Sequence, residues 1–269
     1  MVSSLEPRVP EGIDITHPSI ARVYDYLLDG KDNFAVDRAV ADKLMASHLE
    51  PKRLALANRD FLVRAVRFVA EQGVAQFLDL GSGLPTSPSV HEVARDVVPG
   101  ARVVYVDHDP VVIAHNRALL ATGDGLVTVR ADLRDPQAVL GSEIVKDCLD
   151  FAQPVAILLL SILHFIGDEE DPEGIVARYR DALAPGSFLV LSTGTSQGAD
   201  PGMVSGTRDA YQDYSTPFRL RSHAEVLRLF DGFELADPGV VLMQDWRPGK
   251  TTDRVPLKAT NLSGAGVKR

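Results

Sequence analysis

Short apolar runs alternate with helical segments from Val74 onward, and this alternation limits how the chain can fold. The runs with strand character are VAQFLDL, ARVVYVD, GLVTVRAD, PVAILLLS and GSFLVLSTG. Helical patterns lie between them, near residues 89–98, 110–121 and 172–183. Strands and helices that alternate at this spacing predict βαβ units, and almost wholly apolar runs are typical of parallel strands covered on both faces. The sequence therefore predicts an α/β fold with a mostly parallel sheet.

The segments on either side of this alternation have a different character. Before it, apolar residues recur at helical spacing near residues 18–28, 36–47 and 51–72, which predicts an N-terminal helical extension. After it, FELADPGVVLMQDW contains two apolar stretches joined by turn residues, which predicts a hairpin and an antiparallel end to the sheet. The small, polar end LSGAGVKR is expected to be loose. The expected division is a tail and helical lid or extension over 1–72, a core over 73–256 and a C-terminal tail over 257–269.

The composition excludes several classes of protein. A net charge of -9 argues against nucleic acid as the main partner, because a phosphate backbone calls for a basic face. Cys148 is the only cysteine, so neither an internal disulfide nor a cysteine-based zinc cluster can form, which fits a reducing cytoplasm. The longest apolar run, from Pro154 to Ile166, is shorter than the roughly 20 residues of a membrane span. With no secretory pattern at the N-terminus, we expect a cytoplasmic protein without a membrane partner.

A glycine-rich turn follows the first strand, in the stretch DLGSGLPTSPSV. Ligands of open α/β sheets bind beyond the carboxyl ends of the strands, where glycines let a ligand approach the backbone amides. Pro85 stands where a dinucleotide loop usually has its next glycine, and the following helix is expected to start late. Such a turn is a poor pyrophosphate cradle but leaves room for an amino-acid-sized group; a tight turn without a ligand is the alternative. The residues assigned to the turn are Asp79, Gly81, Ser82 and Gly83.

The second strand ends at Asp107, where a carboxylate can accept hydrogen bonds from both hydroxyls of a ribose. His108 would then lie against the base of a nucleotide. For Asp109, capping of the helix that begins at Pro110 is the preferred interpretation. Metal binding by DHDP is an alternative, but no second cluster of ligands stands nearby in the sequence, so we expect no metal site.

The third and fourth strands supply the remaining candidates. Asp132 follows the third strand, where a carboxylate can accept a hydrogen bond from an adenine amino group, and Leu133 is assigned to the same site; a solvated loop acid is the alternative. Ser161 and His164 stand at or just after the fourth strand and would face the reactive end of the ligand, although His164 can also be a packed or surface histidine. The run GDEEDPEG is expected to be a solvated segment before a helix, with magnesium binding as the alternative.

These residues together resemble the S-adenosylmethionine-dependent methyltransferase fold. More narrowly, the sequence resembles an actinobacterial methyltransferase family first described as a domain of unknown function. The stretches that carry this resemblance are PSIARVYDYLLDGKDNFAVDR, DLGSGLPT, HEVA, LHFIGDEEDP, LAPGSFLVLS and DGFELADPGVVLMQDWRP. The resemblance runs from about residue 18 to residue 248. It implies a Rossmann-like sheet of seven strands, the last antiparallel, that binds S-adenosylmethionine. By position, Gly81 and Gly83 would approach the methionine moiety, Asp107 the ribose and Asp132 the adenine, while Pro85 departs from the third glycine of the broad motif.

The resemblance implies methyl transfer, for which we expect a small-molecule acceptor. His164 is the candidate general base, because the usual pKa of histidine lies near neutrality. Tyr24, Lys31 and Asn33, at the end of the first helix, are candidates for a lid or for substrate contacts; a packed helix with a polar turn is the alternative. Two rival functions stay open. Asp107 after a glycine turn would also serve an NAD-dependent oxidoreductase, and the binding residues would be shared by a non-catalytic S-adenosylmethionine-binding protein.

Overall fold

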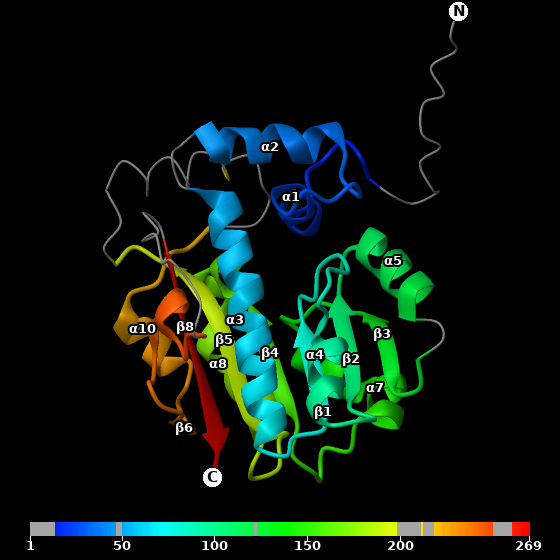
Figure 1. Cartoon of the computed structure of the whole chain (residues 1–269), viewed down its shortest axis with the longest axis vertical. Coiled ribbons are helices and arrows are strands. Elements are labelled where there is room, and N and C mark those ends of the chain that lie inside the picture. Colours follow the sequence, from blue (N-terminus) through cyan, green and yellow to red (C-terminus); the bar gives the residue numbers. More distant parts are fainter. Residues whose placement is uncertain (1–13, 47–49, 121–122, 198–210, 212–217, 250–259) are drawn as a thin grey trace, which may run out of the picture.

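A mixed sheet forms the centre of the protein, whose computed structural model describes residues 14–46, 50–120, 123–197, 211, 218–249 and 260–269 (Figure 1). The strand order is β3-β2-β1-β4-β5-β8-β6, and β7 also pairs with β8. The first five strands are parallel, which confirms the predicted fold class. The strands are β1 Gln76–Leu80, β2 Arg102–Asp107, β3 Leu126–Arg130, β4 Ala156–Leu160, β5 Phe188–Thr195, β6 Phe233–Leu235, β7 Val241–Leu242 and β8 Thr260–Lys268.

Strand β8 corrects two expectations about the C-terminal part of the chain. LSGAGVKR, expected to be a loose tail, forms most of β8, which pairs with β5 over the whole length of β5. The expected hairpin is also wrong, since β6 and β7 each pair antiparallel with β8. The small residues that suggest a tail are needed for close packing: a Cβ on Gly266 would lie 2.9 Å from Cβ of Phe233. The described sheet thus has eight strands instead of the seven expected.

Helices cover both faces of the sheet. On one face, α3 and α4 pack with Trp246 in an apolar cluster in which the rings of Phe61 and Trp246 meet edge to face, with centroids 5.3 Å apart. On the other face lie α6, α7, α8 and α10. Figure 1 shows α1 and α2 beyond the carboxyl ends of the strands. The helices are α1 Ile20–Leu27, α2 Ala35–Ala46, α3 Pro51–Glu71, α4 Val90–Val97, α5 Pro110–Leu120, α6 Pro136–Gly141, α7 Glu143–Cys148, α8 Pro172–Asp181 and α10 His223–Arg228.

Local sequence signals explain where the helices start. Ser89 caps α4 in a reciprocal pair with Glu92, so the helix after the glycine turn does begin late. The carboxylate of Asp109 accepts a hydrogen bond of 2.8 Å from the N–H of Val111, as expected for the cap of α5. Helices α6 and α7 were not predicted, because six residues each are too few for a periodic pattern. No described helix combines the length and the apolar character needed to span a lipid bilayer.

The N-terminal extension is helical, as expected, and α1, α2 and α3 share an apolar cluster of their own. Its members include Val23 and Leu27 from α1, Leu44 from α2 and Ala55 from α3. The tail expected before these helices falls mostly on residues 1–13, which lie outside the described residues. The extension therefore forms a packed unit that stands over one end of the sheet.

Candidate functional site

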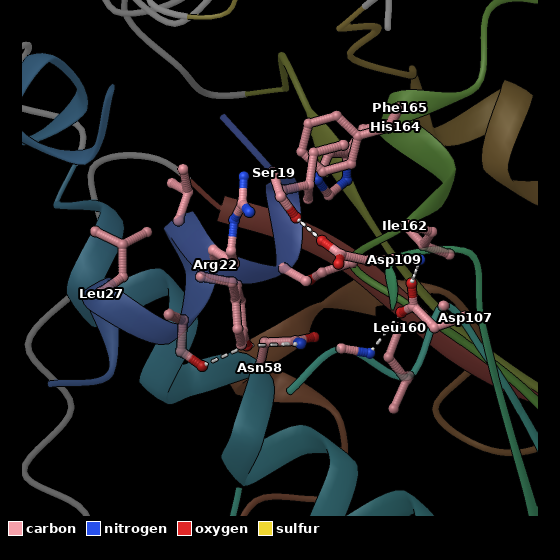
Figure 2. A pocket seen from close by; sticks show the side chains of 18 of the residues that line it. Ser19, Arg22, Leu27, Asn58, Asp107, Asp109, Leu160, Ile162, His164 and Phe165 are labelled. Atoms are coloured by element: carbon pink, nitrogen blue, oxygen red, sulfur yellow. Dashed lines mark hydrogen bonds between the residues drawn. The ribbon is translucent and has the colours of Figure 1, made fainter. Parts of the chain in front are cut away.

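A cavity of about 560 Å³ lies at the carboxyl ends of the strands, next to α1 (Figure 2). It adjoins the position between β1 and β4 where the strand order reverses, which is the usual ligand site of an open α/β sheet. Its volume lies within the range of about 300–1,000 Å³ that ligand pockets have. The walls come from α1, α2, α3, the turns after β1 and β2, the segment after β4, the end of β5 and Asn261 of β8.

Most site residues predicted from the sequence line this cavity. They are Tyr24, Asp79, Gly81, Ser82, Gly83, Asp107, His108, Leu133, Ser161 and His164. Among the described residues, Lys31, Asn33 and Asp132 lie outside its walls. Lys31 is exposed, and the amide of Asn33 donates to the carboxylate of Asp25 at 2.8 Å, so it closes the turn after α1. This hydrogen bond favours the alternative interpretation, a packed helix with a polar turn.

Asp132 is held by arginine outside the cavity. The guanidinium of Arg134 lies 2.6 Å from its carboxylate and 2.6 Å from that of Glu170. Partial burial raises the pKa of Asp132, but the hydrogen bonds from Arg134 outweigh it and hold the pKa below its ordinary value. The backbone neighbours Ala131 and Leu133 line the cavity instead. The segment predicted for the site therefore reaches the cavity through Ala131 and Leu133, and the carboxylate of Asp132 does not line it.

The glycine turn needs its glycines for two different reasons. Gly81 has φ +73°, and a Cβ there would lie 2.8 Å from Cγ1 of Ile162, so both backbone conformation and space exclude a side chain. Gly83 has φ +66°, but a Cβ there would meet no atom within 4 Å. Its N–H donates to the carboxylate of Asp107 at 2.9 Å. Gly81 is therefore packed against the protein, while Gly83 leaves open space beside the cavity.

Asp107 is buried, and its two carboxylate oxygens each accept one backbone N–H. The donors are Gly83, to Oδ2 at 2.9 Å, and Asp109, to Oδ1 at 2.9 Å. Burial raises the pKa of Asp107, and these two hydrogen bonds oppose that rise. Each oxygen keeps acceptor capacity for one more donor. Two oxygens of a fixed carboxylate at the cavity wall suit the two hydroxyls of a ribose.

Asp79 and Arg59 are two further ionisable residues in the cavity wall, and the charge of Arg59 acts on Asp79. Burial raises the pKa of Asp79 to about 7; Arg59 lowers it and Asp107 raises it further. Nη2 of Arg59 donates to the carbonyls of Thr86, at 2.9 Å, and Pro88. Its buried Nε–H has no partner among the described residues. An unsatisfied cationic donor is costly, so this atom fits the carboxylate of an amino-acid-sized ligand.

Arg59 was missed in the sequence. Arg59 lies in α3, next to the buried Asn58. Nothing in the local sequence indicates that its side chain faces a cavity formed with the turn after β1. The only signal was an arginine on a largely apolar stretch of helix.

His164 lines the cavity with its ring neutral. Its Nδ1 accepts the N–H of Gly194 at 3.2 Å, which leaves the ring proton on Nε2. Burial lowers the pKa of His164 to about 3, with a further contribution from Arg221. A neutral ring whose other nitrogen already carries a proton donates a hydrogen bond and is a poor proton acceptor. The geometry therefore counts against the base predicted from the sequence.

A chain of neutral polar side chains crosses the cavity wall near β4, β5 and β8. Asn58 donates to the hydroxyl of Tyr24 at 3.1 Å and accepts the hydroxyl of Ser192 at 2.6 Å. The Ser192 hydroxyl accepts the N–H of Ser161 at 2.9 Å, and Asn261 donates to Oγ of Ser161 at 3.1 Å. Asn58, Ser192 and Asn261 were missed, because they meet partners far away in the sequence.

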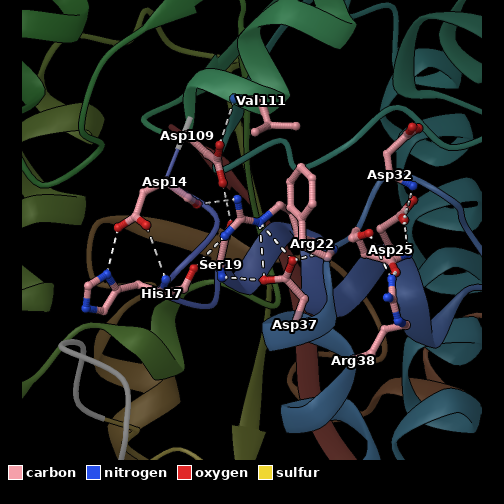
Figure 3. A network of polar contacts seen from close by, with 12 residues as sticks. Asp14, His17, Ser19, Arg22, Asp25, Asp32, Asp37, Arg38, Asp109 and Val111 are labelled. Carbon is pink, nitrogen blue, oxygen red and sulfur yellow. Dashed lines mark hydrogen bonds and ion pairs between the residues drawn. The ribbon is translucent and has the colours of Figure 1, made fainter. Parts of the chain in front are cut away.

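A polar network ties α1 to its surroundings (Figure 3). Arg22 and Asp37 form an ion pair with 3.1 Å between nitrogen and oxygen, and their side chains are 3% and 0% exposed. Arg22 also donates to the carbonyl of Asp14 at 2.9 Å, and Asp37 accepts the N–H of Ser19 at 2.9 Å. The hydroxyl of Ser19 donates to Asp109 at the start of α5. The network fixes α1 as a roof that meets the core at this contact.

Within the part of the chain that the structure describes, no three histidine, cysteine, aspartate or glutamate side chains gather as metal ligands.

Comparison with known proteins adds a family. The family model for S-adenosyl methyltransferases matches residues 7–269. The crystal structure of a candidate methyltransferase from Thermobifida fusca is similar at 43% identity and a TM-score of 0.91, covering 98% of this chain and 100% of that one. A DUF574 family protein from Streptomyces avermitilis is 38% identical with a TM-score of 0.91, covering 95% and 99% of the two chains.

More distant similarity concerns the fold alone. Geranyl diphosphate methyltransferase, in complex with S-adenosylmethionine, is 13% identical with a TM-score of 0.50, over 77% of this chain and 85% of that one. No curated protein matches the chain significantly.

Proposed function

The chain belongs to the S-adenosyl methyltransferase family, and from this membership we propose that its cavity has a cofactor half and an acceptor half. The protein is an S-adenosylmethionine-dependent methyltransferase, as the family match over residues 7–269 shows. The NAD-dependent alternative for the glycine turn is thereby set aside. The cofactor half is defined by Arg59, Asp79, Gly81, Gly83, Asp107 and Leu133, and the acceptor half by Tyr24, Asn58, Ser161, His164, Phe165, Phe218 and Asn261.

Each part of the cofactor half suits one part of S-adenosylmethionine. The open space beside Gly83 suits the methionine moiety, and the unsatisfied Nε–H of Arg59 suits its carboxylate. The two oxygens of Asp107 suit the ribose hydroxyls. Leu133 and the exposed ring of His108 would flank the adenine, in place of the contact predicted for Asp132. The observation that carries this assignment is the fixed carboxylate of Asp107 directly beside the glycine turn.

When bound, S-adenosylmethionine supplies a methyl group on a positively charged sulfur. The protein contributes alignment, exclusion of water and electrostatics. Asp79 and Asp107 put two carboxyl groups in a buried wall, and each of them that is ionised favours a cationic ligand over an anionic one. The roof formed by α1 limits the access of water to the reacting groups. These contributions need no general base, which agrees with the neutral, hydrogen-bonded state of His164.

We further propose a small-molecule acceptor and a cytoplasmic place of action. The cofactor and the acceptor must share about 560 Å³, and the net charge of -9 does not suit nucleic acid. Cys148 is a free, buried thiol, as expected in a reducing compartment. Cell fractionation tests the cytoplasmic location, and recovery of the protein outside the cytoplasm would contradict it.

The assignment of Asp107 is tested by calorimetric titration with S-adenosylhomocysteine, with NAD as the control ligand. Asp107→Ala removes two hydrogen bonds to a ribose and should weaken binding by roughly ten- to hundred-fold. The matched control is Asp132→Ala, which should leave the affinity unchanged because that carboxylate lies outside the cavity. Equal losses in both variants would restore the adenine contact predicted from the sequence. Absence of binding to the unaltered protein would refute the proposed cofactor site.

A second titration isolates Arg59. Arg59→Gln should lower the affinity for S-adenosylhomocysteine by about ten-fold or more, since a charged hydrogen bond is lost. The same variant should bind 5′-methylthioadenosine as the unaltered protein does, because that compound lacks the amino-acid group. An equal loss for both ligands would mean that Arg59 only supports the turn through Thr86 and Pro88.

A further inference from the structure

We propose that the acceptor half of the cavity binds a small, uncharged aromatic compound whose oxygen or nitrogen accepts a hydrogen bond from Nε2–H of His164. This inference rests on the proposed division of the cavity and adds the chemical class of the acceptor. Three features of the cavity wall carry it: one free donor, a cluster of aromatic rings, and the absence of an available cation among the described residues that line the acceptor half.

The free donor is Nε2–H of His164. The N–H of Gly194 occupies Nδ1, and the described residues offer Nε2 no partner. His164 follows β4 by four residues, so its ring stands at the switch point where the cofactor half meets the acceptor half. Figure 2 shows its ring beside that of Phe165 at the cavity. A donor on the cavity wall selects a ligand that presents a lone pair, because an apolar ligand would cover it and leave it unsatisfied.

Aromatic rings surround this donor. The ring centroids of His164 and Phe165 lie 4.4 Å apart, and those of His164 and Phe218 lie 5.3 Å apart. Tyr211 stacks on Phe218 with centroids 4.7 Å apart and an angle of 6° between the planes. All four rings line the cavity, together with Leu27. Rings attract further rings in edge-to-face or offset contacts, so the wall favours a flat aromatic body over a saturated one.

Charge excludes an anionic acceptor. Arg22, which also lines the cavity, is paired with Asp37, and the neutral ring of His164 offers no positive charge. Arg59 stands in the cofactor half with Asp79, and Asp107 adds a second buried carboxylate. A phosphate or carboxylate group on the acceptor would therefore lose its hydration without gaining a cation. The polar chain through Asn58 and Ser161 consists of neutral groups, which suit an uncharged ligand.

The size of the cavity limits the acceptor as well. About 560 Å³ is an ordinary volume for one ligand, and here it must hold two. The acceptor is accordingly small, with about one or two fused rings.

The test uses the full chain saturated with S-adenosylhomocysteine and three probes of similar shape: 2-naphthol, 6-hydroxy-2-naphthoate and 2-decalol. Calorimetry should show 2-naphthol binding about ten-fold more tightly than the naphthoate, which adds a charge, and than the decalol, which lacks the aromatic rings. Equal or tighter binding of the naphthoate would overturn the uncharged class. Equal binding of the decalol, or no binding of any probe, would overturn the aromatic class.

Two variants locate the contacts. His164→Phe keeps a ring but removes the hydrogen-bond donor, and should lower the affinity for 2-naphthol by about five- to ten-fold. Phe218→Leu should bring the affinity for 2-naphthol towards that for 2-decalol. Both should bind S-adenosylhomocysteine as the unaltered protein does, which also reports that they fold. His164→Gln, which restores a donor, should recover part of the affinity; no change in either His164 variant would refute the donor.

The two proposals fail in different ways. If S-adenosylhomocysteine does not bind, the cofactor half has been assigned wrongly. If it binds but the probes show no preference, only the acceptor class is wrong.

Discussion

The two halves of the cavity are built in different ways. The cofactor half depends on backbone geometry at the ends of neighbouring strands, where Gly83 donates to Asp107 and Gly81 packs on Ile162. The acceptor half depends on side chains from α1, α3, β8 and the segments after β4 and β5. Asn58 and Ser192, for example, are 134 residues apart in the sequence. A site made of local turns leaves a motif in the sequence, whereas a site made of tertiary contacts does not.

The largest expected effect separates the two glycines of the cofactor half. Both Gly81→Ala and Gly83→Ala place a side chain at positive φ, which costs about 1 kcal/mol or more. Gly81→Ala adds a clash with Ile162, and should lower the free energy of unfolding by about 1–3 kcal/mol beyond the loss in Gly83→Ala. Urea unfolding measures both variants.

Binding gives the matching measurement. Gly81→Ala should lose most of its affinity for S-adenosylhomocysteine because the turn itself must shift. Gly83→Ala should weaken binding by filling the open space beside the methionine moiety, and its loss of stability should be limited to the cost of its positive φ. Equal stability of the two variants would show that Ile162 yields easily and that the packing of Gly81 does not define the turn.

The second effect is a pH dependence confined to the cofactor half. The pKa of Asp79 in the folded protein, about 7, exceeds the ordinary value of 3.8, so the folded state binds this proton more tightly. The stability from Asp79 is therefore complete below about pH 4 and decreases as the pH rises to about 7. Asp79→Asn should match the unaltered protein at low pH and exceed its stability above pH 7, by the order of a few kcal/mol without ligand.

Urea unfolding across this pH range measures the difference, and parallel curves for the two proteins would contradict the raised pKa. The acceptor half supplies the contrast. His164, with its pKa lowered to about 3, stays neutral over the same range, so binding of 2-naphthol should not change between about pH 5 and pH 8.

The same contrast explains what the sequence could and could not predict. The sheet, the N-terminal helices and the cap at Ser89 follow from periodicity and local signals, and they agree with the structure. The role of β8 could not be predicted from local sequence. At Gly264 and Gly266 a Cβ would lie too close to side chains that only the tertiary structure brings near. A stretch of small residues has the same composition in a tail and in a crowded strand.

The candidate site divides along the same line. Asp79, Gly81 and Asp107 could be predicted because a parallel strand must end in a turn on the ligand side. Asp132 has the same position in its strand, yet Arg134 holds its carboxylate outside the cavity, a contact that no spacing rule specifies. Arg59 and Asn58 were missed because a helix that crosses the sheet can present residues to a site formed much later in the chain.

A smaller effect is expected in the acceptor half from Asn58. Asn58→Leu removes one hydrogen-bond partner from Ser192 and one from Tyr24, and should lower the free energy of unfolding by about 1–3 kcal/mol. A double-mutant cycle with Ser192→Ala should give a coupling energy of about 0.5–3 kcal/mol. Additive losses would show that the two side chains act independently. Binding of S-adenosylhomocysteine should persist in both variants, because neither side chain belongs to the cofactor half.

The smallest effect concerns the contact between the roof and the cofactor half. The hydroxyl of Ser19, on the residue that precedes α1, donates to Asp109, which caps α5 two residues after Asp107. Ser19→Ala removes this hydrogen bond at a cost of about 0.5–1.5 kcal/mol. The pair of Arg22 and Asp37 remains, so the roof should stay folded but open more often. Stopped-flow displacement should then show S-adenosylhomocysteine dissociating a few times faster. Ser142→Ala, at a helix start where the hydroxyl makes no capping hydrogen bond, is the matched control. An unchanged dissociation rate in Ser19→Ala would mean that the ligand leaves by another path, and that the roof is a fixed wall of the acceptor half instead of a moving cover of the cofactor half.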